Sequence, residues 1–165
     1  MKFFFATLSL IVLLSCNTDT ARLKTLQSEI NYLNAKNDSL EKEIQSIKPR
    51  LSDLMLEIQV HHDKLWFAGK NEDWPLAQFE HDKIMEILTQ AEKIETDRNE
   101  VKLFKVMIYP QLDSVQLSIN QRNADLFTAA FTTLTGACNN CHTNTKFGFN
   151  KIVIPDHPPY SNQEF

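Results

Sequence analysis

Two cysteines and a histidine near the carboxyl end have a spacing that can attach a cofactor. Cys138 and Cys141 are three positions apart and His142 follows directly, so the segment has the pattern C-x-x-C-H. Residues three apart on a helix share a face, which lets both thiols form thioethers to the vinyl groups of one haem. The adjacent imidazole then reaches the iron from the same side. The pattern therefore predicts one covalent haem c, with His142 as the proximal iron ligand.

The two cysteines have three other conceivable uses. A structural disulfide would join them to each other. A thioredoxin-like redox pair would follow a strand and begin a helix, whereas this pair is expected to end a helix. A zinc site needs four ligands. Because the only other cysteine is Cys16, zinc would have to recruit further ligands from His61, His62, His81 or His157.

A methionine and a histidine earlier in the chain are candidate ligands for the other face of the iron. In an antiparallel bundle the start of the first helix lies beside the end of the last, which makes Met55 the first candidate distal ligand. His62 shares this helix face about 10 Å further along and is the second candidate. His61, one position round the helix, is expected to face solvent. A methionine at helical spacing is also an ordinary core residue, so an open or apolar-blocked distal site stays an alternative.

Four amphipathic helices are expected to position these residues. The spacing of apolar residues predicts helices over about 51–68, 74–94, 100–121 and 123–141. Asp73 is expected to cap the second helix, and Pro110 to kink the third. The chain has only three glycines and few alternating apolar runs, which argues against a sheet. Short links imply antiparallel neighbours, so the expected fold class is all-α, an antiparallel four-helix bundle.

The N-terminus has the composition of an export signal. Residues 1–15 combine one lysine, a run of about a dozen apolar residues and a serine before Cys16. The run is shorter than the roughly 20 residues of a membrane-spanning helix. Its ending, Leu-Leu-Ser-Cys, resembles the lipobox of bacterial lipoproteins. That resemblance implies that Cys16 becomes the mature N-terminus, carries lipid and anchors the protein on the periplasmic side of the inner or outer membrane. An ordinary cleaved signal and an uncleaved anchor helix are the alternatives.

A coiled-coil spacer is predicted over residues 22–48. Apolar residues recur there every seven positions, with Leu23, Ile30, Asn37 and Ile44 at the a positions and Leu26, Leu33, Leu40 and Ile47 at the d positions. Asn37 is the only polar residue among them, and a lone asparagine at a is typical of parallel dimers. At 1.5 Å per residue, the 27 residues would span about 40 Å.

The charges beside this apolar seam agree with a parallel pair of helices. Lys36 would face Glu41 of a second copy, and Glu43 would face Lys48. Exposed pairs of this kind contribute only a few tenths of a kcal/mol each, so they select the partner rather than hold it. The expected partner is a second copy in a parallel homodimer. The alternative is a solitary amphipathic helix lying along the protein's own bundle.

A C-x-x-C-H motif at the end of the last helix of a predicted four-helix bundle resembles the class II cytochromes c, of which cytochrome c′ is the best known. The resemblance covers about residues 51–144, and the spacer and tail depart from cytochrome c′. It implies a monohaem protein. With Met55 on the iron, electron transfer is the expected function. With an open distal position, as is usual in cytochrome c′, the protein would bind nitric oxide or carbon monoxide.

A third reading is a tethered dimeric adaptor in which the haem is structural. An enzyme is not expected, because no catalytic constellation accompanies the predicted iron. The formal net charge of −4 gives no basic face for nucleic acid, and the redox partner is not identified by the sequence. The predicted organisation is a signal peptide at 1–15, a linker at 16–21, the spacer at 22–48, the haem-binding bundle at 49–146 and an extended, proline-containing tail at 147–165.

Overall fold

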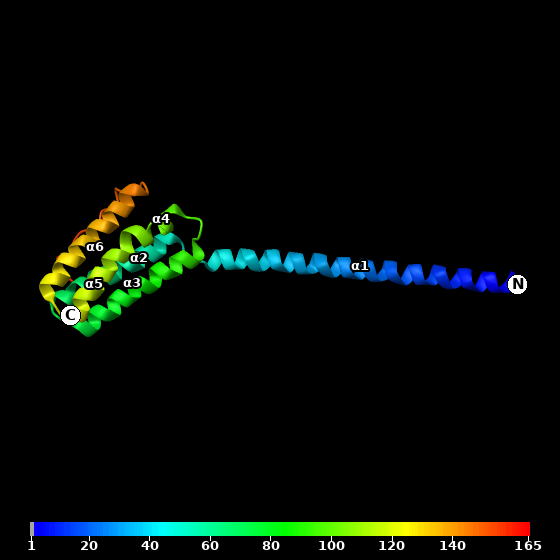
Figure 1. Cartoon of the computed structure of the whole chain (residues 1–165), viewed down its shortest axis with the longest axis horizontal. Coiled ribbons are helices and arrows are strands. Elements are labelled where there is room, and N and C mark those ends of the chain that lie inside the picture. Colours follow the sequence, from blue (N-terminus) through cyan, green and yellow to red (C-terminus); the bar gives the residue numbers. More distant parts are fainter. Residues whose placement is uncertain (1) are drawn as a thin grey trace. The chain divides into compact units, whose positions relative to one another are not determined.

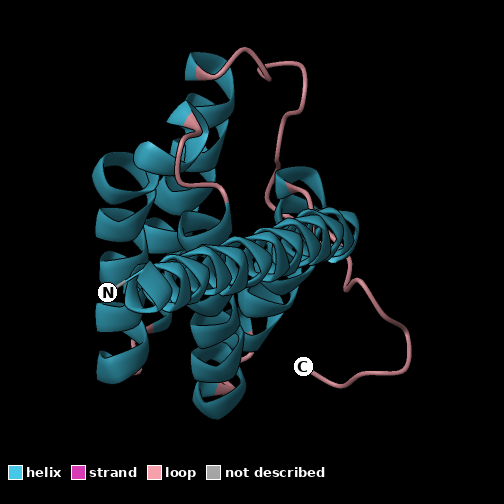
Figure 2. Cartoon of the chain, turned by 90° about the vertical axis from the view of Figure 1, so that its right-hand side faces the viewer, coloured by secondary structure: helices cyan, strands magenta, loops and turns pink. Residues whose placement is uncertain are grey.

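The computed structural model describes the backbone of residues 2–165 and the side chains of residues 20–165. The predicted lipid attachment at Cys16 therefore lies outside the described side chains. The chain divides into two compact units, Met1–Lys48 and Pro49–Phe165. Figure 2 shows helices and loops throughout, and residues 2–165 contain no strand. Within the described part of the chain, no helix combines the length and the apolar character needed to cross a membrane.

The first unit is one long helix, α1 (Lys2–Ile47), which is labelled in Figure 1. The helix is continuous through residues 16–21, which the sequence predicted as a linker. It ends just before Pro49, because the residue preceding a proline is pushed out of the helical region. All the apolar side chains of the predicted heptads are exposed, with exposed fractions between 46% and 75%.

The second unit confirms the predicted all-α bundle. Its long helices are α2 (Leu51–Lys70), α3 (Trp74–Ile94), α5 (Tyr109–Gln121) and α6 (Ala124–Asn144). Each packs against the next, α2 on α3, α3 on α5 and α5 on α6, and α6 packs back on α2. The short α4 (Asn99–Lys102) and the π-helical segment η1 (Phe104–Ile108) lead into α5. Four helices therefore enclose one apolar interior.

Polar side chains at two helix starts determine where α3 and α6 begin. The Asp73 side chain accepts a hydrogen bond from the backbone N–H of Leu76 at 3.1 Å, and Asn123 does the same for Leu126 at 2.9 Å. Each bond satisfies one of the N–H groups that a first helical turn leaves unpaired. The cap at Asp73 confirms the prediction from the sequence.

The helix predicted over 100–121 is interrupted rather than merely kinked. It comprises α4, the π-helical η1 and α5, and the N–H of Tyr109 bonds to the carbonyl of Phe104 five residues back. Pro110 explains the wider turn, because its ring has no N–H to donate and collides with the carbonyl four residues earlier in a regular α-helix. The prediction of one bent helix was wrong in this detail, and the proline is the cause.

Aromatic side chains fill the interior at one end of the bundle. Phe127 and Phe131 of α6 are fully buried, and their ring centroids are 5.8 Å apart. Trp66 of α2 lies 5.0 Å from the Phe131 ring. The two helices approach closely at Gly69, where a Cβ atom would lie 2.2 Å from the Phe127 ring. A larger residue at position 69 would therefore force the Phe127 ring or the helices to move.

The segment 147–165 forms no helix and returns along the second unit. Its carboxyl end reaches the end of α2, where the side-chain amide of the C-cap residue Asn71 donates to the carbonyl of Phe165 at 2.7 Å. Lys64 of the same helix lies over the ring of Tyr160, 5.1 Å from its centroid. The tail is thus attached to the bundle along much of its length.

Candidate functional site

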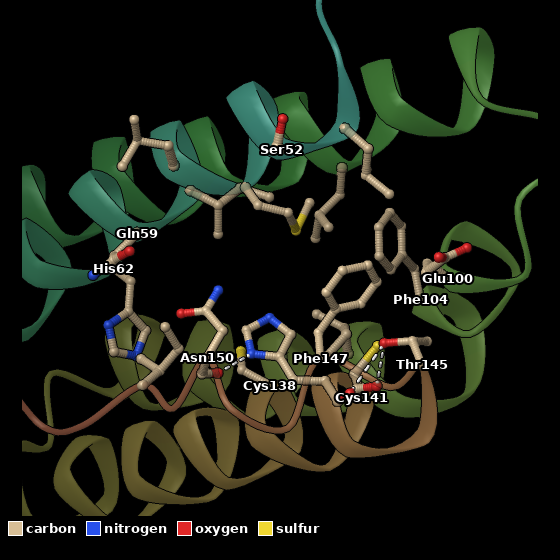
Figure 3. A pocket seen from close by; sticks show the side chains of 18 of the residues that line it. Ser52, Gln59, His62, Glu100, Phe104, Cys138, Cys141, Thr145, Phe147 and Asn150 are labelled. Carbon is tan, nitrogen blue, oxygen red and sulfur yellow. Dashed lines mark hydrogen bonds between the residues drawn. The ribbon is translucent and has the colours of Figure 1, made fainter.

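A cavity of about 810 Å³ opens between α2 and α6 in the second unit. This volume lies within the roughly 300–1,000 Å³ of pockets that bind small molecules and cofactors. Figure 3 shows Gln59 and His62 of α2 on one side and Cys138 and Cys141 of α6 on the other. The side chains of Phe104 and Ile108 from η1 add an apolar wall. The lining of the cavity is therefore largely apolar and includes several polar groups.

Both cysteines of the C-x-x-C-H motif line this cavity as free thiols. They lie near the end of α6, so the motif ends a helix, as the sequence predicted, and does not begin one. Burial and, to a smaller extent, the neighbouring Cys141 raise the pKa of the Cys138 thiol to about 12. Burial, followed by the charge of Glu100, also raises the pKa of Cys141. Both groups are neutral at physiological pH, unlike the low-pKa thiolates of disulfide oxidoreductases.

His142 lines the same cavity and is held by the tail. Its Nδ1 lies 2.6 Å from the backbone carbonyl oxygen of Asn150, a contact drawn as a dashed line in Figure 3. A carbonyl can only accept, so the proton is on Nδ1, and the neutral ring carries its lone pair on Nε2. Imidazoles that ligate metals commonly have this arrangement, with the other ring nitrogen donating to a carbonyl.

Met55 is brought to the cavity from the opposite helix. It lies one turn into α2, is partly buried and contributes to the lining together with Ile58 and Gln59. The antiparallel packing of α2 on α6 produces this meeting, because the start of the first bundle helix lies beside the end of the last. The structure therefore brings Met55 and the complete C-x-x-C-H motif to one space.

His62 also lines the cavity, but its ring is already engaged. Its Nε2 lies 2.9 Å from the hydroxyl of Thr135, and that hydroxyl donates its only proton to the carbonyl of Phe131 at 3.0 Å. Nε2 must therefore donate, which leaves the lone pair on Nδ1. Nδ1 is buried without a hydrogen-bond partner. His62 thus fastens α2 to α6 at the inner end of the cavity, beside the Phe131 ring at 4.4 Å.

The expectation that His61 faces solvent was wrong. Its side chain is 15% exposed, and its Nδ1 contacts the carboxylate of Glu80, which is 1% exposed, at 2.5 Å. A carboxylate this deeply buried needs a partner, and His61 supplies one across the contact between α2 and α3. Nothing in the sequence distinguishes Glu80 from a surface residue, because α3 contains several charged residues.

Two histidines outside the cavity have other partners. His81 bonds through Nε2 to the backbone carbonyl of Leu112 at 3.1 Å, and His157 pairs with Asp156 in the exposed tail. No three His, Cys, Asp or Glu side chains come together as metal ligands among the described residues. The groups at the cavity that could bind a metal or cofactor include the two thiols, the imidazoles of His62 and His142, the thioether of Met55 and the carboxylates of Asp53, Glu95 and Glu100.

Several lining residues could not be found from the sequence. The tail supplies Phe147, Asn150 and Ile152. Arg50 and Arg98 line the cavity as well, and each is paired with a carboxylate, Arg50 with Asp53 at 2.9 Å. No motif marks these positions, because their role depends on how the tail and the α3–α4 loop return to the bundle.

Comparison of the chain with protein-family models, with curated proteins and with solved structures finds no match. What the site can do chemically therefore follows from its own residues. A flat, apolar group with two reactive vinyl positions and a metal centre would meet two thiols, an imidazole with a free Nε2 and a thioether within one cavity.

Proposed function

We propose that the protein is a membrane-anchored, extracytoplasmic c-type cytochrome with one covalent haem, and that it transfers electrons. The observation that carries the proposal is the cavity of about 810 Å³ that Cys138, Cys141 and His142 line together, with Met55 contributed by the facing helix. A motif that resembles covalent haem attachment and a cofactor-sized space are independent features, and here they coincide.

The residues have defined roles in holding the haem. Cys138 and Cys141 each add an S–H bond across one vinyl group, so that sulfur bonds to one carbon, hydrogen goes to the other and no oxidant is consumed. His142 binds the iron through Nε2, because its Nδ1–H is occupied by the Asn150 carbonyl. The bound haem supplies a centre that accepts and releases a single electron.

Met55 is the distal ligand in this proposal. Its thioether belongs to a partly buried side chain that lines the cavity. His62 is the weaker candidate, because ligation would have to break its hydrogen bond to Thr135 or use the buried Nδ1. A methionine opposite a histidine raises the reduction potential of haem iron, and two permanent ligands limit rearrangement during electron transfer.

Anchoring is proposed from the N-terminal sequence. The signal-like residues 1–15, followed by Cys16, support export and attachment through lipid on that cysteine. Export also agrees with the cofactor, since haem c is attached outside the cytoplasm. The redox partner is not specified by any described surface.

The test is an absorption spectrum of the full chain produced in a host that matures c-type cytochromes. We expect a red protein whose haem resists extraction by acidified organic solvent, with sharp low-spin bands when reduced. Met55→Ala should convert these to high-spin bands that shift with carbon monoxide. Met107→Ala is the matched control, because Met107 is partly buried but does not line the cavity, and it should leave the spectrum unchanged.

Three outcomes contradict parts of the proposal. A colourless protein with free thiols at Cys138 and Cys141 would reject haem attachment. A parent chain that is already high-spin and binds carbon monoxide would replace electron transfer with gas binding at an open iron. A low-spin Met55→Ala variant would move the distal role to another residue, with His62→Ala as the next variant to measure.

A further inference from the structure

The first unit presents an apolar stripe whose side chains are exposed over residues 23–47. The a and d residues of α1 from Leu23 to Ile47 are large and exposed, among them Ile30 at 50% and Leu33 at 57%. They recur with a period of 3.5 residues, so they form a narrow seam along the helix. Isolated apolar residues on a surface are ordinary, but a continuous seam of this length marks an interaction surface.

We propose that residues 22–48 of α1 bind the same segment of a second copy as a parallel, two-stranded coiled coil. The choice of residues at the seam selects this partner. Branched Ile30 and Ile44 occupy a positions, and leucines occupy three of the four d positions, a combination that favours two parallel strands over three or four.

Asn37 further favours a parallel pair of helices in this register. In the single chain its side-chain amide donates to Glu41 at 3.2 Å on the exposed helix surface. At an a position of a parallel pair it would face Asn37 of the second copy, and the two amides can satisfy each other. A shifted register or an antiparallel pair would place this amide against an apolar side chain without a partner, which is costly.

Charge complementarity points the same way. In a parallel pair each g residue lies next to the e residue five positions later on the other helix. Lys36 thereby meets Glu41 of the second copy, and no like-charged pair arises among the g and e residues of residues 22–48. The seam therefore fits a copy of itself better than it fits a lipid surface, which would favour a broader apolar face.

The test uses the full chain solubilised in detergent, with Ile47→Cys as the reporter. Ile47 is at the d position nearest the end of the coil, so a parallel pair brings the two new thiols together, and oxygen should join them as a disulfide. An antiparallel pair would place each opposite Leu23, about 36 Å from its counterpart. Tyr32→Cys is the control, since Tyr32 is also exposed, at 65% against 75% for Ile47, but lies off the seam.

We expect the parent chain to sediment as a dimer, Ile47→Cys to cross-link and Tyr32→Cys to behave like the parent. Leu33→Lys/Leu40→Lys should give monomers and keep the helical content of the second unit. A parent chain that is monomeric at tens of micromolar would overturn the proposal. So would a dimer in which Ile47→Cys fails to cross-link, or one in which Tyr32→Cys cross-links equally well.

A second inference comes from a different observation, the attachment of the tail to the motif itself. Asn139 lies between the two cysteines, and its side chain binds both backbone groups of Ile152. Its Nδ2 donates to the Ile152 carbonyl and its Oδ1 accepts from the Ile152 N–H, each at 2.8 Å. Two residues earlier, the Asn150 carbonyl accepts from His142.

We infer that Asn139 is a positioning residue for the His142 imidazole. By fixing the backbone at Ile152, it holds the Asn150 carbonyl where it keeps the proton of His142 on Nδ1 and the lone pair on Nε2. The importance of that lone pair rests on the proposed function, in which Nε2 binds iron. The positioning itself is a property of the chain alone.

Nitrogen NMR of the His142 ring in the haem-free chain tests the positioning without haem. Asn139→Ala should lower the population of the Nδ1–H tautomer at least severalfold relative to the parent. Asn140→Ala is the matched control, because Asn140 is the other asparagine of the motif and its side chain is exposed, and it should keep the parent tautomer. Equal tautomer populations in the two variants would overturn the inference.

The haem-loaded chain gives a separate readout. A strong hydrogen bond at Nδ1 makes a ligating imidazole more basic and lowers the reduction potential. Asn139→Ala should therefore raise the midpoint potential, and Asn140→Ala should not. Loss of haem attachment in the parent would reject the proposed function and leave the tautomer result to decide the positioning role.

Discussion

At the scale of single side chains, burial raises the pKa of both thiols of the cavity. The pKa of Cys138 is raised from about 9 to about 12, which lowers its thiolate fraction at neutral pH about a thousandfold. A more basic thiolate is also a better nucleophile, which offsets part of this loss. Covalent attachment in the folded chain would therefore need a partner that deprotonates or exposes the sulfur.

Alkylation measures this effect directly. In a haem-free Cys16→Ser/Cys141→Ser chain, we expect iodoacetamide to modify Cys138 about 30- to 100-fold more slowly at pH 8 than in the same chain unfolded in urea. Mass spectrometry of timed samples gives both rates. Equal rates in the folded and unfolded chains would show that Cys138 is accessible and has an ordinary pKa.

The hydrogen bond between His62 and Thr135 is a second feature at this scale. Thr135→Val keeps the size and branching of the side chain but removes the acceptor of the His62 Nε2–H. We expect a loss of about 1–3 kcal/mol in the free energy of unfolding, because a buried donor is left unsatisfied.

Thr133→Val is the control for that loss. The Thr133 hydroxyl is exposed and bonds only to the backbone of its own helix, so a change within about 0.5 kcal/mol is expected. Urea unfolding followed by circular dichroism provides both values. Equal losses in the two variants would mean that the intrahelical bond, and not the contact with His62, carries the effect.

At the scale of the elements, the approach of α2 to α6 is limited by one glycine. A Cβ atom at Gly69 would overlap the Phe127 ring, whereas at Gly136 of α6 nothing lies within 4 Å of the added atom. Gly69→Ala should lower the free energy of unfolding by about 1–3 kcal/mol through overpacking.

Gly136→Ala should raise it by up to about 1 kcal/mol, because alanine is the better helix former. Chemical unfolding of the two variants should therefore show changes of opposite sign in the free energy of unfolding for the same substitution. A stabilising Gly69→Ala would mean that Phe127 can move aside at little cost.

Helix α3 and its neighbour illustrate how far the sequence could predict the elements. The range 74–94 was predicted for α3, and the structure has Trp74–Ile94. Asp73 and Pro75 mark the start of the helix clearly. Asp73 caps it, and proline is tolerated only in the first turn of a helix. The region 100–121 was predicted less well, since a proline signals distortion but does not specify whether the backbone bends, breaks or widens into η1.

The candidate site was predictable where it depends on motif and helix pairing. The motif is enough to predict Cys138, Cys141 and His142 as site residues. The position of Met55 opposite them is predicted from the antiparallel packing of the helices. The tail contacts were not predictable, because Asn139 binds the backbone of Ile152, and any residue can supply backbone groups. The burial of Glu80 could not be predicted for a related reason. In a sequence, a buried carboxylate cannot be told from an exposed one until its partner is known.

At the scale of the whole molecule, the free-energy cost of leaving the cavity empty is large compared with the stability of a small domain. Keeping about 810 Å³ dry and empty would cost on the order of 20 kcal/mol at roughly 24 cal/mol per Å³. Domains are stable by only about 5–15 kcal/mol in total. The space must therefore be filled by a bound group, admit water or collapse.

Thermal unfolding distinguishes these outcomes. We expect the haem-loaded chain to unfold cooperatively and at a higher temperature than the haem-free chain, since a group attached to the folded form stabilises it. The haem-free chain should also bind a hydrophobic dye and exchange its amide protons faster in α2 and α6. Identical melting temperatures and no dye binding would indicate that the bundle closes fully on its own.

The widened turn at η1 has a consequence for how such a bundle accommodates a change of occupant. In this turn the backbone N–H of Tyr109 bonds to the carbonyl five residues back, whereas in an α-helix it would bond to the carbonyl four residues back. Phe104 and Ile108, which both belong to this turn, are also walls of the cavity. We therefore expect the chain to adapt by exchanging hydrogen-bond partners within η1, so that the apolar wall formed by Phe104 and Ile108 moves while the regular helices around it keep their register.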